Sequence, residues 1–90
     1  VVSVMSSAQN MHGGQEATVL SMYRTMYHWG AIVVAPGYTD KAIAEAGGNP
    51  YGTTATVDGE GNVPDSVLPA VAHQTKRVLD VASWIKAGKG

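Results

Sequence analysis

Two adjacent glycines, Gly13 and Gly14, separate an apolar run from a stretch with helical periodicity, and they constrain the fold of this chain more than any other feature. Glycines at the end of a strand let the backbone approach a bound group closely, and the free N–H groups of a helix start face the same place. The pattern therefore indicates a binding loop between a strand and a helix. An ordinary strand-to-helix turn has the same signature.

The segment before this loop, Val1–Met5, is short, apolar and rich in β-branched residues, which is typical of a strand covered on both faces in a parallel sheet. Residues 6–11 are small and polar, so we expect a loop at the carboxyl end of that strand, where open α/β sheets bind ligands. The chain begins inside this apolar strand and without Met. We therefore expect it to be one piece of a longer chain.

The residues between Gly14 and Gly30 form a predicted helix with an unusually wide apolar arc. Two neighbouring stripes contribute to the arc: Val19, Met22, Met26 and Trp29, and beside them Leu20, Tyr23 and Tyr27. Two interpretations fit the arc, a helix buried in its own domain or a helix that also packs on another subunit. Gly30 is expected to cap the helix end.

A second apolar run, Ala31–Ala35, is a predicted strand that Pro36 and Gly37 end. A strand, a helix and a strand in succession form a right-handed crossover, so the two strands should be parallel and adjacent. Two strands alone do not make a stable sheet, which points to missing partner strands.

Residues 38–52 form a long irregular segment in which Asp40 is expected to cap one helical turn that runs to Ala46. A β pattern resumes at residues 53–57, so residues 38–52 are interpreted as a loop inserted into the second strand. A loop of this length in a compact domain is usually functional or disordered.

The final element is a predicted amphipathic helix that covers the sheet, starting near Asp65 or Ser66. Its apolar positions recur every 3.6 residues: Leu68, Val71, Ala72, Thr75, Val78, Leu79, Ala82 and Ile85. The opposite face, which carries His73, Lys76 and Arg77, is expected to lie in solvent.

Composition and motifs argue against several classes of function. The 90 residues contain no Cys and carry a net charge of −1 without a basic patch, so a nucleic-acid partner is not expected. The three His residues lack metal-ligand spacing, and neither a Gly-x-Ser-x-Gly elbow nor a Walker or Gly-x-Gly-x-x-Gly pattern occurs. We predict no metal site and no catalytic residue. Without a membrane-length apolar run or a signal peptide, a cytoplasmic protein is the expectation.

His28 lies in the last turn of the first predicted helix, far from the glycine loop at its start. A helix of about 15 residues spans roughly 22 Å, so His28 would reach a ligand of a neighbouring subunit more easily than one held by its own loop. A capping or packing role is the alternative.

Taken together, four motifs resemble one family along essentially the whole chain. Ser6-Ser7, Gly13–Glu16, His28–Gly30 and Gly47–Gly52 keep the order and approximate spacing of the WrbA family. These proteins are flavodoxin-like, FMN-dependent NAD(P)H:quinone oxidoreductases.

The resemblance implies an α/β fold with a five-stranded, doubly wound parallel sheet. Residues 1–90 would be the C-terminal half of one such domain and supply its last two strands and last two helices. The N-terminal half, with the phosphate-binding loop, would lie elsewhere. The resemblance also implies NAD(P)H and a quinone as substrates and a homotetramer. The alternative is a non-enzymatic flavodoxin-fold subunit or fragment that serves oligomer assembly.

The resemblance implies that FMN is bound by the glycine loop together with His28. The residues concerned are Ser7, Ala8, Gln9, Asn10, Met11, His12, Gly13 and His28. Many relatives have a Thr- and Gly-rich stretch where this chain has Ala8–His12, so the loop departs from the family in its side chains. FMN itself would perform the hydride chemistry, while protein groups orient and tune it.

Overall fold

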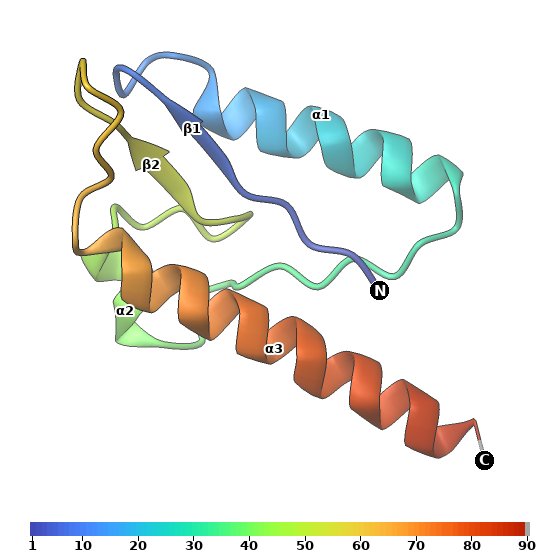
Figure 1. Ribbon diagram of the computed structural model, residues 1–90. Helices are drawn as coiled ribbons and strands as arrows, with labels where there is room; N and C mark the ends of the chain where they lie inside the picture. The colour runs from blue at the N-terminus through green and yellow to red at the C-terminus, as the bar shows by residue number, and fades with distance from the viewer. Residues whose placement is uncertain (90) are drawn as a thin grey trace.

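The computed structural model describes residues 1–89, which form two short parallel strands and three helices. In chain order these are β1 (Ser6–Ala8), α1 (Gln15–His28), α2 (Lys41–Glu45), β2 (Thr54–Thr56) and α3 (Val67–Gly88). Helix α1 lies along one side of the strands and α3 along the other, with α2 packed against α3 (Figure 1). The predicted α/β class with a parallel sheet is confirmed.

Regular strand pairing in the first extended segment begins at Ser6, further along the chain than the sequence predicts. Ser6–Ala8, which we expected to be loop, pairs in parallel with Thr54–Thr56. The apolar residues 1–5 contribute only one bridge, in which the N–H of Val2 donates to Ile32 and its C=O accepts from Val34, both at 2.9 Å. The prediction of a loop is wrong for residues 6–8, because ladder hydrogen bonds use backbone groups and small polar side chains allow them.

The predicted strand at Ala31–Ala35 therefore appears only as a bridge at Val33, parallel to the first segment as expected. This bridge and β2 use the same edge of that segment, because Val2, Ser6 and Ala8 all direct their backbone groups toward it. The chain leaves the edge after residue 34 and returns to it at residue 53. The intervening segment is closed at its base by a hydrogen bond of 2.9 Å from the N–H of Gly37 to the C=O of Pro50.

Val4 lies between the two pairings, and side chains from both helices satisfy its backbone groups. Tyr23 on α1 accepts the N–H of Val4 at 3.2 Å and donates its own hydroxyl to the C=O of Tyr51 at 2.5 Å. Gln74 on α3 donates to the C=O of Val4 at 2.9 Å. Gly52 packs so closely here that a Cβ would lie 2.1 Å from the Val4 oxygen. At Val4, where the sheet pairing is interrupted, side-chain hydrogen bonds thus replace the ladder and the close approach of Gly52 fills the space.

Gln74 is fully buried and uses both ends of its amide. Its Oε1 accepts the N–H of Thr53 at 2.7 Å, and its Nε2 donates to Ser3 Oγ at 2.6 Å in addition to Val4. Buried amides require such partners, so these bonds fix where α3 sits on the sheet. The apolar core beside them consists of Val4, Val19 and Tyr23, with Met26 and Val33 packed against it.

The face of α3 that meets the protein is not the one that the apolar pattern predicts. Val67, Ala70 and Gln74 are buried, whereas Leu68 and Leu79 are 60% and 62% exposed. Arg77, expected in solvent, is partly buried and donates from Nε to the C=O of Ala35 at 3.0 Å. Gln74 anchors the buried face to the sheet, while Val78 and Leu79 of the apolar pattern line an open groove.

Local capping follows the sequence more closely. Gly30 has a φ of +71° and donates to Tyr27, while Ala31 donates to Met26, so the predicted glycine cap of α1 is confirmed. Asp40 caps α2 by accepting the N–H of Ala42 at 2.9 Å, again as predicted.

The turn after β2 is held by Asp58, whose carboxylate accepts the backbone and side-chain N–H groups of Asn62 and the N–H of Glu60. These bonds lower the pKa of the Asp58 carboxyl below its ordinary value. Within residues 1–89, no helix is both long and apolar enough to cross a membrane.

Replacing Gln74 with Leu tests the polar closure of the sheet. The variant should lose at least about 3 kcal/mol of unfolding free energy, because three partners, two of them in buried bonds, lose their hydrogen bonds at roughly 1–3 kcal/mol each. Urea denaturation measures the change. The exposed neighbour Thr75→Val is the control and should stay within about 0.5 kcal/mol of wild type. If the Leu variant is as stable as that control, the hydrogen bonds of Gln74 do not hold α3 in place.

Candidate functional site

The loop between β1 and α1, residues 9–14, is organised by Asn10. The C=O of Asn10 accepts the N–H of Gly13 at 3.0 Å, and its side-chain Oδ1 accepts the N–H of His12 at 3.0 Å. A Cβ on Gly13 would lie 2.5 Å from the Cβ of Ala8. Gly14 has a φ of +81°, which side chains other than glycine rarely tolerate. One glycine is therefore required for space and the other for conformation.

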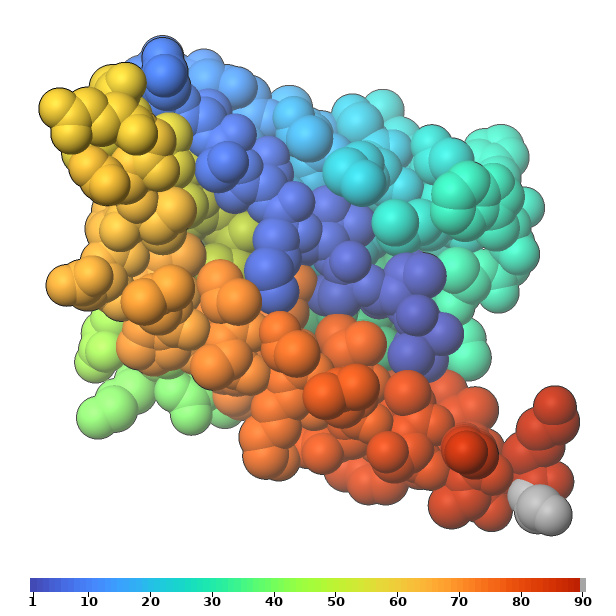
Figure 2. Space-filling view, viewed as in Figure 1, coloured from blue at the N-terminus to red at the C-terminus, as the bar shows by residue number. Residues whose placement is uncertain are grey.

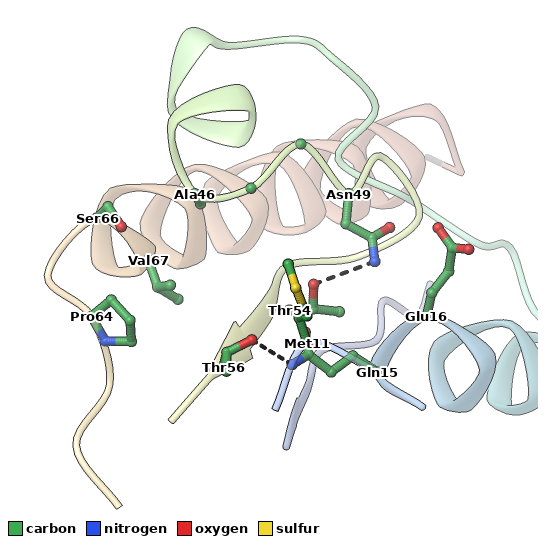
Figure 3. Close-up of a pocket in the computed structure, with 12 residues that line it drawn as sticks. Met11, Gln15, Glu16, Ala46, Asn49, Thr54, Thr56, Pro64, Ser66 and Val67 are labelled. Atoms are coloured by element: carbon green, nitrogen blue, oxygen red, sulfur yellow. Dashed lines mark hydrogen bonds between the residues drawn. The ribbon is translucent and has the colours of Figure 1, made fainter. Parts of the chain in front are cut away.

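Gln15, the first residue of α1, connects this loop to β2. Its Nε2 donates to the C=O of Asn10 at 3.2 Å and to Thr56 Oγ1 at 2.8 Å (Figure 3). No sequence pattern predicts these contacts of Gln15. Its place directly after the two glycines, at the first turn of the helix, was the available signal.

The helix start itself has an open backbone. No side chain caps α1 at Gly14, and the N–H groups of a first helical turn have no partner within the helix. Gln9, Asn10, Met11 and His12 are exposed. Glu16, exposed in the first turn, is the only Asp, Glu, Lys or Arg in residues 6–16. The loop thus offers backbone donors and small polar side chains, without a cation that would attract a phosphate group.

A cavity of about 450 Å³ lies beside the loop. Figure 3 shows Met11, Gln15 and Glu16 facing it from one side, with Thr54 and Thr56 from β2. The rest of the wall comes from two more segments: Ala46, Gly47, Gly48 and Asn49, and Pro64, Ser66 and Val67. The fold thereby brings residues of the Gly13–Glu16 and Gly47–Gly52 motifs around one cavity.

The predicted site residues fall into two places. Ser7–Gly13 are contiguous at the carboxyl end of β1, whereas His28 is exposed at the opposite end of α1 (Figure 1). The helix has 14 residues, so its ends are about 21 Å apart at 1.5 Å per residue. Within one chain, His28 and the loop do not converge on one ligand.

The other histidines form no cluster with it. His73 Nε2 lies 2.6 Å from Thr39 Oγ1, and that hydroxyl donates to the C=O of Pro36, so the ring nitrogen must be the donor. Among residues 1–89, no three His, Asp or Glu side chains are close enough to hold a metal ion.

Replacing Gly13 with Ala tests the tight turn. The added methyl would meet Ala8 and the Asn10 oxygen, so the variant should lose about 1–3 kcal/mol of stability through overpacking. Urea denaturation gives the change. Gly59→Ala is the matched control, because nothing lies within 4 Å of a Cβ there and its φ is not positive. Equal effects of the two substitutions would contradict the close contact.

The chain is similar to known proteins along nearly all of its residues. No model of a protein family matches it. Curated relatives named NAD(P)H dehydrogenase (quinone) do: the protein of Deinococcus radiodurans is 42% identical over 81 residues, which cover 90% of this chain and 40% of the relative. That of Geotalea daltonii is 36% identical over 91% of this chain and 43% of the relative. That of Methanosarcina mazei is 35% identical over 99% of this chain and 45% of the relative.

The chain thus spans less than half the length of these relatives, at an identity that persists over nearly all of its own residues. The family resemblance drawn from the motifs is confirmed by these relatives, which are named NAD(P)H dehydrogenase (quinone).

Proposed function

We propose that this chain is part of an FMN-dependent NAD(P)H:quinone oxidoreductase and forms the C-terminal half of its flavodoxin-like domain. The names of the relatives support the activity, and the share of their length that the chain matches supports the partial domain. The observation that carries the proposal is the position of Ser7–Gly13, which form the end of a parallel strand and the exposed loop at its carboxyl end.

The loop suits the uncharged part of FMN better than its phosphate. Residues 6–13 carry no Lys or Arg, and Gly13 and Gly14 keep the backbone free of side chains where a flat ring would approach. Ser7–Gly13 would hold the flavin ring through small polar groups and the exposed backbone of the loop. FMN, when bound, supplies hydride acceptance from NAD(P)H and two-electron reduction of the quinone. The residues of this chain bind and orient, and none is needed as a proton-transfer catalyst.

The free edge of the first segment supports the proposed N-terminal half. On the side of that segment away from Val33 and β2 lies a groove of about 400 Å³, and Ser3 is among the residues that line it. Val1, Met5, Met26, Val78 and Leu79 give this groove an apolar lining. Figure 2 shows the amino-terminal segment at the surface between α1 and α3. Further strands of the domain would cover this edge and bring the phosphate-binding loop.

The exposed apolar surface near the end of α1 supports a contact with another subunit, as in the proposed tetramer. Met22, Tyr27 and Trp29 are 44%, 64% and 71% exposed, an apolar surface that favours a protein contact. His28 belongs to this surface, so a subunit contact there would bring it to a neighbouring subunit. We propose that it contacts that subunit's flavin.

The direct test uses the full-length polypeptide that carries this sequence. It should bind FMN, develop the visible absorption bands of a bound flavin and oxidise NAD(P)H when benzoquinone is added. Absence of both flavin bands and NAD(P)H oxidation would refute the enzymatic proposal. An oligomer that binds no flavin would favour the assembly role instead.

Replacing His28 with Ala tests the shared site. Because His28 is exposed, the fold should be retained, while FMN affinity in the assembled protein should fall by about three- to tenfold, the equivalent of roughly 0.7–1.4 kcal/mol. Fluorescence titration with FMN measures the affinity. His73→Ala, on α3, is the control and should leave it unchanged. An unaltered affinity in the His28 variant would exclude the contact.

A further inference from the structure

We propose that Gln15 is a positioning residue that holds the candidate flavin loop in its binding conformation by connecting it to β2. The inference rests on the proposed function for its ligand, but its structural part concerns the loop alone. The two N–H groups of the Gln15 amide have two partners, the C=O of Asn10 at 3.2 Å and Thr56 Oγ1 at 2.8 Å. Because both donors are used, the amide has one orientation, which Figure 3 shows directed toward β2.

Asn10 is the residue through which Gln15 acts on the loop. Its C=O also accepts the N–H of Gly13, and its side chain accepts the N–H of His12. These two bonds span only two or three residues and lie in an exposed loop. Without Gln15 they would be the only hydrogen bonds within residues 1–89 that hold the turn at Asn10. Gln15 adds a connection to β2, which lies outside the loop.

Thr56 provides the β2 end of that connection. It ends β2, pairs with Ala8 at the end of β1, and follows the segment that closes on itself between Gly37 and Pro50. The amide of Gln15 therefore spans from the loop to the neighbouring strand at the carboxyl edge of the sheet. A loop fixed in this way loses less conformational freedom when a ligand binds, which raises affinity without any added contact.

The chain offers a matched set of variants. Gln15→Leu keeps the size of the side chain and removes both donors. Thr56→Val removes only the acceptor on β2, and Thr56→Ser restores it. Thr54→Val is the control, because Thr54 lines the same cavity on the same strand, but its hydroxyl pairs with Asn49 at 3.4 Å and makes no contact with the loop.

The first measurement requires no cofactor. In the full-length polypeptide without FMN, amide hydrogen exchange at His12 and Gly13 should become about tenfold faster in Gln15→Leu and faster to a lesser degree in Thr56→Val. Both N–H groups donate to Asn10, His12 to its side chain and Gly13 to its C=O, and Asn10 loses the support of Gln15. Thr56→Ser and Thr54→Val should exchange like wild type. Recovery in the Ser variant separates a hydroxyl contact from a packing effect of the side chain.

The second measurement is FMN affinity by fluorescence titration. Gln15→Leu should bind FMN about tenfold more weakly and Thr56→Val about three- to fivefold more weakly, whereas Thr56→Ser and Thr54→Val should stay within about twofold of wild type. The double variant Gln15→Leu/Thr56→Val should be no weaker than Gln15→Leu alone, since the two residues share one bond.

The two measurements distinguish failure of this inference from failure of the proposed function. Unchanged exchange in Gln15→Leu, or equal effects of Thr56→Val and Thr54→Val, would overturn the positioning role. If Gln15→Leu alters the exchange but the wild-type protein binds no FMN, the positioning role is supported and the proposed FMN binding is refuted. Altered exchange with unchanged FMN affinity would overturn the claim that Gln15 prepares the loop for that ligand.

Discussion

The backbone of one residue, Val4, carries the connection between the two layers of helices. It falls where the partner strand is interrupted, so its N–H and C=O have no ladder partner, and an unpaired buried backbone group is costly. Tyr23 from α1 supplies one partner and Gln74 from α3 supplies the other. Both side chains also bond to the chain where it returns to the sheet. Tyr23 donates to the C=O of Tyr51, and Gln74 accepts the N–H of Thr53. The interrupted strand is thus tolerated because polar side chains from opposite sides replace the missing pairing.

The candidate flavin loop repeats this arrangement at the edge of the sheet. There too a side-chain amide, that of Gln15, joins backbone from one segment to a residue of another, although in an exposed setting where each bond contributes less. The difference matters for function. Around Val4 the contacts are buried and define the fold, whereas around Asn10 they shape a surface that a ligand can reach.

Sequence patterns predicted the features that depend on neighbouring residues, but not those that depend on residues far away in the chain. The caps at Gly30 and Asp40 were predictable, because a glycine or an aspartate at a helix end acts through its own neighbours. The pairing of Ser6–Ala8 was not, since it depends on a strand almost fifty residues away. The exposed face of α3 was misassigned because hydropathy does not reveal a buried glutamine with three partners. The motifs indicated the family and the loop, while the cavity beside that loop needed four segments placed together.

The hydrogen bond between Gly37 and Pro50 has a consequence for how this protein tolerates change. It brings the two ends of the interrupting segment together, so the segment meets the sheet through a narrow neck. Loops with adjoining ends accept changes of length at little entropic cost. Changes of length fit only the exposed residues of this segment, because α2 within it packs against α3 and buries Ile43. Its return through Gly52 is fixed, because a side chain there would collide with the Val4 carbonyl.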